Sequence, residues 1–184
     1  MRTLTKDDIR RAVRARKALL DERERSDAAD RAFAMLEQTA EFLMADRILM
    51  YHSLADELPT RAFIDRWDGR KKFFLPRVNG VNLDILPYDR TRLELGAFHI
   101  EEPQGDDTVD PDSIELMVIP AVAYDRNGNR LGRGKGFYDR LLASTKARKV
   151  GIAYDFQLVD EIPAEPHDVP VDIVITETRF IRRR

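Results

Sequence analysis

The sequence predicts a single α/β domain over residues 1–184, with a largely parallel sheet flanked by helices on both faces. Short, nearly continuous apolar segments alternate along the chain with segments of helical periodicity, as buried strands and covering helices do. A length of 184 residues fits one domain of this class. A glycine-rich segment follows a central strand, which is where parallel sheets bind ligands.

Helical periodicity and capping residues predict four helices. Thr5 and Asp8 form a capping-box pattern, and Ile9 and Val13 then fall on one apolar face of the first helix. The expected ranges are 5 to about 23, about 27 to 43, a short helix ending at 67, and 137 to about 146.

Six short apolar segments are expected to form strands, because strands buried on both faces are apolar throughout. They are 47–52, 72–76, 82–86, 116–119, 150–154 and 172–175. Residues 101–113 are acidic and contain two prolines, so this segment is expected to be a surface loop.

The composition excludes several classes of function. The chain has no cysteine, which rules out a disulfide scaffold, a thiolate metal site and a cysteine nucleophile. Its net charge of −2 gives no bulk attraction to nucleic acid. No apolar run approaches the ~20 residues of a membrane span, and the first residues lack an apolar signal core. We therefore expect a cytoplasmic protein, a monomer, with no nucleic-acid or membrane partner.

The segment Arg130–Asp139 carries the clearest chemical signal. Three glycines alternate with Arg133 and Lys135, and Asp139 follows. Glycines let the backbone approach a ligand closely, and the two cations add positive charge at the same place. This combination indicates a loop that binds a phosphorylated ligand, a nucleotide with magnesium.

The segment fits neither of two common phosphate-binding motifs. A Walker loop would need glycine at Asn129 and a hydroxyl residue at Gly136, and the dinucleotide motif would need glycine at Phe137. The alternative is a structural hairpin whose turn lies at Asn127 and Gly128.

Four other features of the sequence each leave two interpretations open from the residues alone. Asp139 is either a magnesium ligand or a carboxylate at a helix N-terminus. Lys6 and Arg10 are either a phosphate contact or a solvated helix edge. Glu57 binds a polar edge of a substrate or caps the next helix. The pair formed by residues 167 and 168 is either catalytic or structural.

The chain resembles the 5-formyltetrahydrofolate cyclo-ligase (methenyltetrahydrofolate synthetase) family over nearly its whole length. The most specific matches are residues 120–125 and 128–139. Weaker matches follow in the expected order at 6–10, 51–60 around Glu57, 102–103, 157–159 and 167–172.

This resemblance implies an enzyme that uses ATP and Mg²⁺ to close 5-formyltetrahydrofolate to 5,10-methenyltetrahydrofolate, releasing ADP and phosphate. It implies that the formyl oxygen attacks the γ-phosphate to form a phosphorylated imidate, after which the neighbouring amine closes the ring.

The resemblance also implies a role for each matching residue. The ATP contacts are Lys6, Arg10, Arg130, Leu131, Gly132, Arg133, Gly134, Lys135, Gly136, Phe137 and Tyr138, with Arg133 and Lys135 catalytic. The magnesium ligands are Asp139 and Asp168. The folate contacts are His52, Glu57, Leu83, Ile85, Gly134, Phe137 and Tyr154.

One departure from the family pattern concerns Leu83 and Ile85. Many relatives carry a methionine paired with phenylalanine or methionine there, so this chain keeps apolar volume but lacks a sulfur or aromatic contact. Two alternatives follow from this: an ATP-using paralogue that acts on another formyl or carboxyl compound, and a non-catalytic protein that binds 5-formyltetrahydrofolate.

Overall fold

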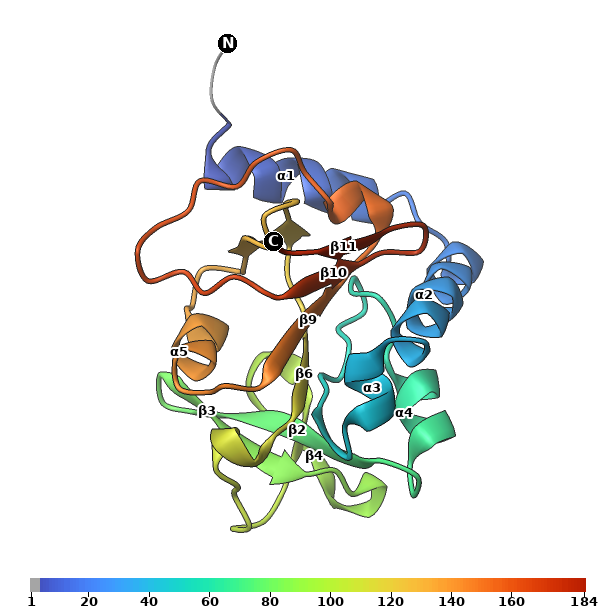
Figure 1. The fold of residues 1–184 in the computed structure, drawn as a ribbon, viewed down its shortest axis with the longest axis vertical. Coiled ribbons are helices and arrows are strands. Elements are labelled where there is room, and N and C mark those ends of the chain that lie inside the picture. The colour runs from blue at the N-terminus through green and yellow to red at the C-terminus, as the bar shows by residue number, and fades with distance from the viewer. Residues whose placement is uncertain (1–3) are drawn as a thin grey trace.

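A seven-stranded sheet forms the centre of the computed structural model, which describes residues 4–184 (Figure 1). Its strand order is β11-β10-β9-β6-β1-β2-β3. Parallel pairs join β1 (Arg47–Leu49), β2 (Lys72–Asn79), β6 (Leu116–Ile119), β9 (Arg148–Ile152) and β10 (Ile173–Ile175). Antiparallel strands close the two edges, β3 (Asn82–Pro87) and β11 (Phe180–Arg182). The prediction of a largely parallel sheet is confirmed.

Helices cover both faces of this sheet, as expected. Phe33 of α2 (Glu22–Glu37), Phe42 of α3 (Ala40–Met44) and Phe63 of α4 (Arg61–Trp67) pack together on one face. Leu141 and Leu142 of α5 (Phe137–Ala143) pack on the other face. Figure 1 shows α5 on the opposite side of the sheet from α2, α3 and α4.

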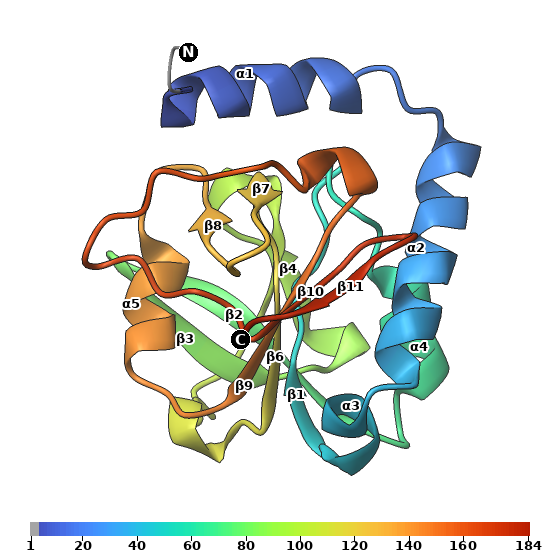
Figure 2. The same cartoon turned by 45° about the horizontal axis from the view of Figure 1, so that its top comes forward.

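The first helix lies across one end of the sheet (Figure 2). Ile9 and Val13 of α1 (Lys6–Lys17) pack on a small hairpin formed by β7 (Ala123–Tyr124) and β8 (Arg130–Leu131). The predicted capping box is present, since the Thr5 hydroxyl accepts a hydrogen bond from the Asp8 N–H at 3.1 Å.

The two helices predicted nearest the N-terminus both end earlier than expected. The first helix ends at Lys17 rather than near residue 23, because Asp21 and Glu24 form a second capping box that starts α2 at Glu22. The second predicted helix is interrupted before residue 40, because the Thr39 hydroxyl accepts a hydrogen bond from Phe42 N–H and starts α3.

The predicted surface loop over residues 101–113 also needs correction. Its first residues form β5 (Glu101–Pro103), which pairs with β4 (Leu93–Leu95) in a hairpin. Glu102 is buried and accepts a hydrogen bond from Val78 N–H, which fastens this hairpin to β2.

Short 3-10 turns complete the structure at Arg90–Arg92, Ala97–His99, Pro111–Ser113 and Asp155–Gln157.

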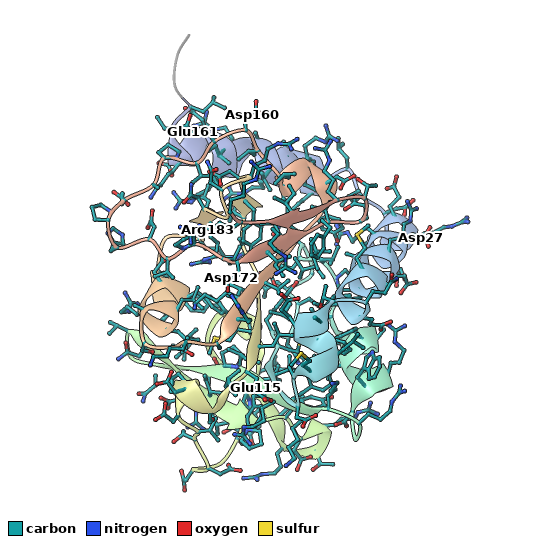
Figure 3. The ribbon with its side chains drawn as sticks, viewed as in Figure 1. Asp27, Glu115, Asp160, Glu161, Asp172 and Arg183 are labelled. Atoms are coloured by element: carbon teal, nitrogen blue, oxygen red, sulfur yellow. The ribbon has the colours of Figure 1, made fainter. Side chains whose placement is uncertain are left out.

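Two carboxylates at the starts of strands align the parallel sheet; both residues are labelled in Figure 3. Glu115 precedes β6 and accepts hydrogen bonds at 2.8 Å from the N–H groups of Asp46 and Arg47, where β1 begins. Asp172 precedes β10 and accepts a hydrogen bond at 2.9 Å from the N–H group of Lys149 of β9.

Among residues 4–184, no helix is long and apolar enough to cross a membrane.

Candidate active site

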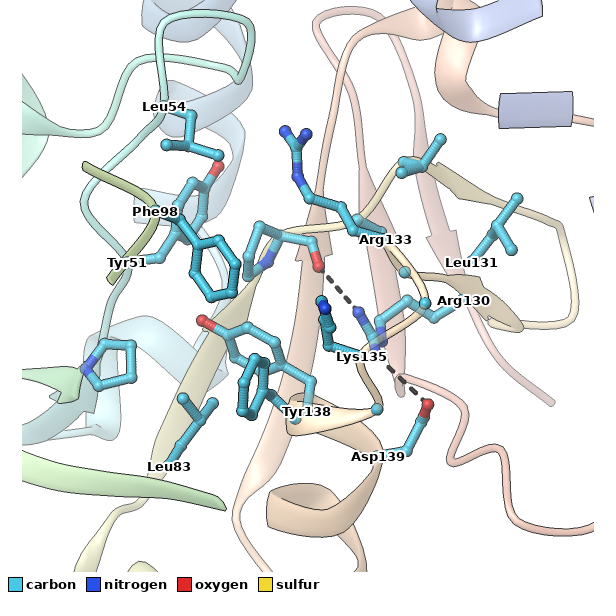
Figure 4. Close-up of a pocket in the computed structure, with 18 of the residues that line it drawn as sticks. Tyr51, Leu54, Leu83, Phe98, Arg130, Leu131, Arg133, Lys135, Tyr138 and Asp139 are labelled. Atoms are coloured by element: carbon cyan, nitrogen blue, oxygen red, sulfur yellow. Dashed lines mark hydrogen bonds and ion pairs between the residues drawn. The ribbon is translucent and has the colours of Figure 1, made fainter. Parts of the chain in front are cut away.

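A cavity of about 570 Å³ opens where β1 and β6 end. Residues that follow β1 and residues that follow β6 line it, together with the whole segment 130–139. This is the carboxyl edge of the parallel strands, as predicted for a ligand site. Figure 4 shows Arg130, Arg133 and Asp139 on one side, Tyr51, Leu54, Leu83 and Phe98 on the other, and Lys135 and Tyr138 between them.

Most of the predicted site residues meet in this cavity. Besides segment 130–139, the predicted residues in its lining are Lys6, Arg10, His52, Glu57, Leu83 and Asp168. Ile85 and Tyr154 do not line it, and both side chains are about 1% exposed. The Tyr154 hydroxyl donates to the Glu57 carbonyl at 3.3 Å, so Tyr154 reaches the site only by supporting Glu57.

The glycine-rich segment has two structural parts. Asn127 and Gly128 form the turn of the β7–β8 hairpin, where the Asp125 carboxylate accepts from the N–H groups of Asn127 and Asn129. The hairpin alternative thus describes the residues before the loop. Gly134 and Gly136 lie in the loop itself, and their φ angles of 104° and 72° favour glycine at both positions.

Arg130 anchors this loop from its buried side. Its guanidinium donates to the Pro120 carbonyl at 3.2 Å, lies 3.6 Å from the Asp139 carboxylate and stacks over the Tyr138 ring. Its Nε is buried without a hydrogen-bond partner. Figure 4 marks the contact between Arg130 and Asp139. Arg130 therefore holds the loop and the start of α5 together at the cavity wall.

The two exposed cations of the loop differ in their partners. Arg133 lies 2.9 Å from the Asp56 carboxylate and 3.5 Å from that of Glu57. The Lys135 ammonium has no ion-pair partner among the described residues. Lys135 is thus available to an anionic ligand, whereas Arg133 is already neutralised by carboxylates.

Two cations of α1 join distant segments at the same site. Arg10 Nε donates to the Gly132 carbonyl at 3.1 Å, which ties α1 to the loop. The Lys6 ammonium lies 2.8 Å from Glu165 and 3.3 Å from Asp168, and the hydrogen bond that Lys6 donates to Glu165 contributes most to raising the pKa of Lys6. Lys6 and Arg10 therefore line the cavity instead of forming only a solvated edge.

Glu57 is an acid of the cavity lining, with about 12% of its side chain exposed. Burial raises the pKa of its carboxyl group, while a hydrogen bond from Leu54 N–H and the charge of Arg133 oppose this rise. Glu57 does not cap the next helix, because α4 has Thr60 at its N-cap without a side-chain cap bond. The capping alternative for Glu57 is therefore wrong.

His52 lies at the edge of the same cavity. Its Nδ1 is buried 3.3 Å from the Glu101 carboxylate without a well-aligned hydrogen bond, and its ring contacts Tyr88 edge-on. Burial lowers the pKa of His52, which favours the neutral imidazole. His52 can therefore offer either a donor or an acceptor to a bound ligand.

Comparison with known proteins decides the family. A sequence model described as the 5-formyltetrahydrofolate cyclo-ligase family matches residues 2–177. The chain belongs to this family. The prediction that it is an enzyme of this kind is confirmed by relatives of that name. The cyclo-ligase of Escherichia coli K12 is 30% identical, with 91% of this chain and 97% of the relative aligned. That of Haemophilus influenzae is 31% identical, with 95% and 100% aligned.

Solved structures agree with this assignment to the cyclo-ligase family. The 5,10-methenyltetrahydrofolate synthetase of Aquifex aeolicus is 32% identical, with a TM-score of 0.89, and the match covers 98% of this chain and 94% of that one. The synthetase of Mycoplasma pneumoniae is 23% identical, with a TM-score of 0.76, and shows the shared fold. That match covers 95% of this chain and 99% of the other.

The acidic residues of this cyclo-ligase family member suit a hard cation. Asp139 Oδ1 accepts from Val169 N–H at 3.4 Å, so Asp139 lies beside the segment that carries Asp168. Ligand atoms of Glu165, His167 and Asp168 lie within 4.8 Å of one another. Carboxylate oxygens are preferred by Mg²⁺, so Asp139 and Asp168 remain suitable candidates. His167 is mostly exposed.

Several cavity residues were not predicted from the sequence. They include Tyr51, Leu54, Phe98, Ile100 and Glu101. Phe98 and His99 lie at the tip of the β4–β5 hairpin with φ angles of 59° and 56°, and Phe98 contacts the Phe137 ring edge-on. The family match at 102–103 was the available signal for this segment, but it did not identify Phe98 as part of the site.

Proposed function

We propose that this chain is an ATP- and Mg²⁺-dependent 5-formyltetrahydrofolate cyclo-ligase. Family membership supports the reaction class, and one observation carries the rest. One cavity is lined both by cations, from segment 130–136 with Lys6 and Arg10, and by Glu57 with apolar side chains. A triphosphate and a reduced folate can thus meet in one space.

The cations of the cavity are proposed to hold the triphosphate. Lys6, Arg10, Arg133 and Lys135 come from two elements that the Arg10–Gly132 hydrogen bond joins. Phosphoryl transfer depends mainly on positioning and on charge stabilisation. Lys135 and Arg133 would stabilise the charge that develops on the transferred group, while Arg130 keeps the loop in place.

Glu57 and the apolar side chains of the cavity are proposed to hold the folate. The pterin ring carries several N–H donors along one edge, and the buried Glu57 carboxylate is an acceptor able to bind them. Leu83 and Phe137 add apolar surface to the same cavity. Ile85 is buried under α5, so Leu83 is the member of that pair that can touch the substrate.

The proposed chemistry needs no protein nucleophile. The formyl oxygen attacks the γ-phosphorus of ATP, the bond to the bridging oxygen breaks, and ADP leaves. The neighbouring amine then attacks the activated formyl carbon and loses its proton. The carbon–oxygen bond breaks, and the former formyl oxygen departs with inorganic phosphate. The residues of the cavity bind, orient and stabilise charge in both steps.

Asp139 and Asp168 are proposed to hold Mg²⁺. Their carboxylates both line the cavity on the side of the cationic loop. When bound, the ion would neutralise phosphate charge. Lys6 now contacts Asp168, so Lys6 would have to leave that carboxylate for the phosphates when the ion arrives.

A direct assay tests this proposal. Purified protein is mixed with 5-formyltetrahydrofolate, ATP and magnesium, and the near-ultraviolet absorbance of the methenyl product is followed. We expect product to form with stoichiometric release of ADP. Tight ATP binding without product would favour a paralogue with another acceptor. Folate binding without ATP turnover would favour a binding protein.

A further inference from the structure

Lys17 is a buried cation for which the proposed reaction has no use. It is the last residue of α1, its side chain is about 6% exposed, and its ammonium lies 3.6 Å from the Asp56 carboxylate. Neither residue lines the cavity. Burial lowers the pKa of Lys17. Burying an ammonium is unfavourable unless a counter-charge compensates it, so this pair behind the cavity wall requires an explanation.

The backbone around Lys17 and Asp56 is held without their charges. Arg25 of α2 donates to the Lys17 carbonyl at 3.4 Å and also to the Ala55 carbonyl. This side chain links the end of α1 to the loop that carries Asp56. Loss of the Lys17 charge should therefore leave the loop in position.

The pair leads directly into the cavity through two further charges. Asp56 accepts hydrogen bonds from Arg133 at 2.9 and 3.2 Å, and Arg133 lies 3.5 Å from Glu57. Positive and negative groups thus alternate from Lys17 through Asp56 and Arg133 to Glu57. Only Arg133 and Glu57, the last two, line the cavity.

We propose that Lys17 is a positioning residue of the site: it is the cation that stays beside Asp56 and Glu57 when Arg133 turns to the phosphates of ATP. The inference rests on the proposed function, in which Arg133 binds phosphate and Glu57 binds folate. Without Arg133, two neighbouring carboxylates would face each other, and like charges favour protonation of one of them. Lys17 counteracts this and keeps Glu57 as an acceptor.

Other groups also act on the Glu57 carboxyl group. They are Asp56 on its own loop, Arg133 on the glycine-rich loop, and the phenol groups of Tyr51, Tyr124, Tyr138 and Tyr154. The tyrosines are neutral over the pH range of an assay, because burial raises their pKa values. Lys17 is therefore the fixed cation to test.

Kinetics provide the first test, with Lys17→Met compared with Lys17→Arg and with the exposed control Lys146→Met. At a pH below the Glu57 pKa, loss of the charge should raise the KM for 5-formyltetrahydrofolate about tenfold, the equivalent of one pKa unit, and change the KM for ATP much less. The acid limb of kcat/KM should move to higher pH. Lys17→Arg should restore both, and identical behaviour of Lys17→Met and Lys146→Met would overturn the inference.

A titration separates this inference from the proposed function. Carbon-13 NMR of the carboxyl groups in the ligand-free protein should show a higher pKa for Glu57 in Lys17→Met. The rise should be larger in an Arg133→Met background, which removes the cation that is proposed to move. An unchanged Glu57 pKa in both backgrounds would overturn the role of Lys17 even in an active enzyme. Absence of methenyl product from the wild type would instead overturn the proposed function.

Discussion

At the scale of single residues, the loop cations Arg133 and Lys135 face different tasks. Arg133 must give up contacts with Asp56 and Glu57 before it can bind phosphate, whereas Lys135 has no such partner among the described residues. Lys135 therefore needs no rearrangement of ion pairs to bind an anion. Charge that is preorganised in this way contributes strongly to stabilising a transition state.

Lys135→Ala should accordingly abolish turnover and leave the fold intact. We expect kcat to fall by roughly 10³-fold, as when a charge-stabilising cation is removed from a phosphoryl-transfer site. The thermal midpoint should stay unchanged, because the ammonium contributes no ion pair. Lys146→Ala is the matched control. Activity retained in Lys135→Ala would show that the loop has been assigned the wrong role.

Glu57→Gln should weaken folate binding and at the same time stabilise the protein. The amide cannot accept as strongly from the pterin donors, so the KM for 5-formyltetrahydrofolate should rise while ATP binding stays near the wild-type value. An ATP-specific defect would refute the placement of Glu57 at the folate. The gain in stability should follow from removing a buried carboxylate, and calorimetry measures it.

The stability gain of Glu57→Gln should depend on pH in a defined direction. Burial raises the pKa of Glu57 in the folded protein above its unfolded value. Ionisation therefore destabilises the fold, and stability is lost as the pH rises from the unfolded pKa through the folded one. The variant should have the higher thermal midpoint above this window. The difference should vanish below a pH of about 4, where both states are protonated.

At the scale of elements, the apolar pattern predicted the helices and every strand of the central sheet except β11, but not the short strands outside that sheet or where the first two helices stop. Apolar spacing continues across Thr39, so periodicity predicted one helix where the structure has α2 and α3. The Thr39 hydroxyl donates to the Leu36 carbonyl at 2.7 Å and accepts from Phe42 N–H at 3.1 Å. Such local bonds compete with helical ones, and hydrophobic periodicity does not register them.

Thr39→Ala should therefore destabilise the protein by about 1–2 kcal/mol, because a buried helix cap is lost. Urea denaturation monitored by circular dichroism measures the change. Thr39→Ser keeps the hydroxyl and serves as the control. A loss of the same size in both variants would assign the effect to the methyl group and contradict the capping role.

Covering elements also decide which strand residues reach the cavity. Leu83 and Ile85 lie two positions apart on β3 and share a face. Leu83 lines the cavity, but Ile85 is buried with Leu141 of α5. Strand alternation puts both residues on one face, whereas the place where α5 begins to cover that face depends on tertiary packing. The same limit applies to Phe98, whose hairpin reaches the cavity through pairing of β4 with β5.

At the scale of the whole molecule, the site joins the two ends of the chain. Lys6 and Glu165 are 159 positions apart, and Arg10 and Gly132 are 122 apart. Topology could be predicted far enough to place the ends of β1 and β6 together, because carboxyl edges of parallel strands meet. The docking of α1 over the β7–β8 hairpin follows no such rule, and only the family resemblance indicated it.

Nucleotide binding should consequently stabilise α1 in particular. A non-hydrolysable ATP analogue with Mg²⁺ would bridge Lys6 and Arg10 to the glycine-rich loop, adding to the contacts of Ile9 and Val13. At about 100 times its Kd, such a ligand adds roughly 2.7 kcal/mol of stability. Hydrogen exchange should slow most in α1, and the thermal midpoint should rise.

The double substitution of Lys6 and Arg10 by alanine should remove most of this gain, with Arg11→Ala and Arg14→Ala together as the control. Protection confined to residues 130–139, with α1 unaffected, would show that α1 does not contact the nucleotide.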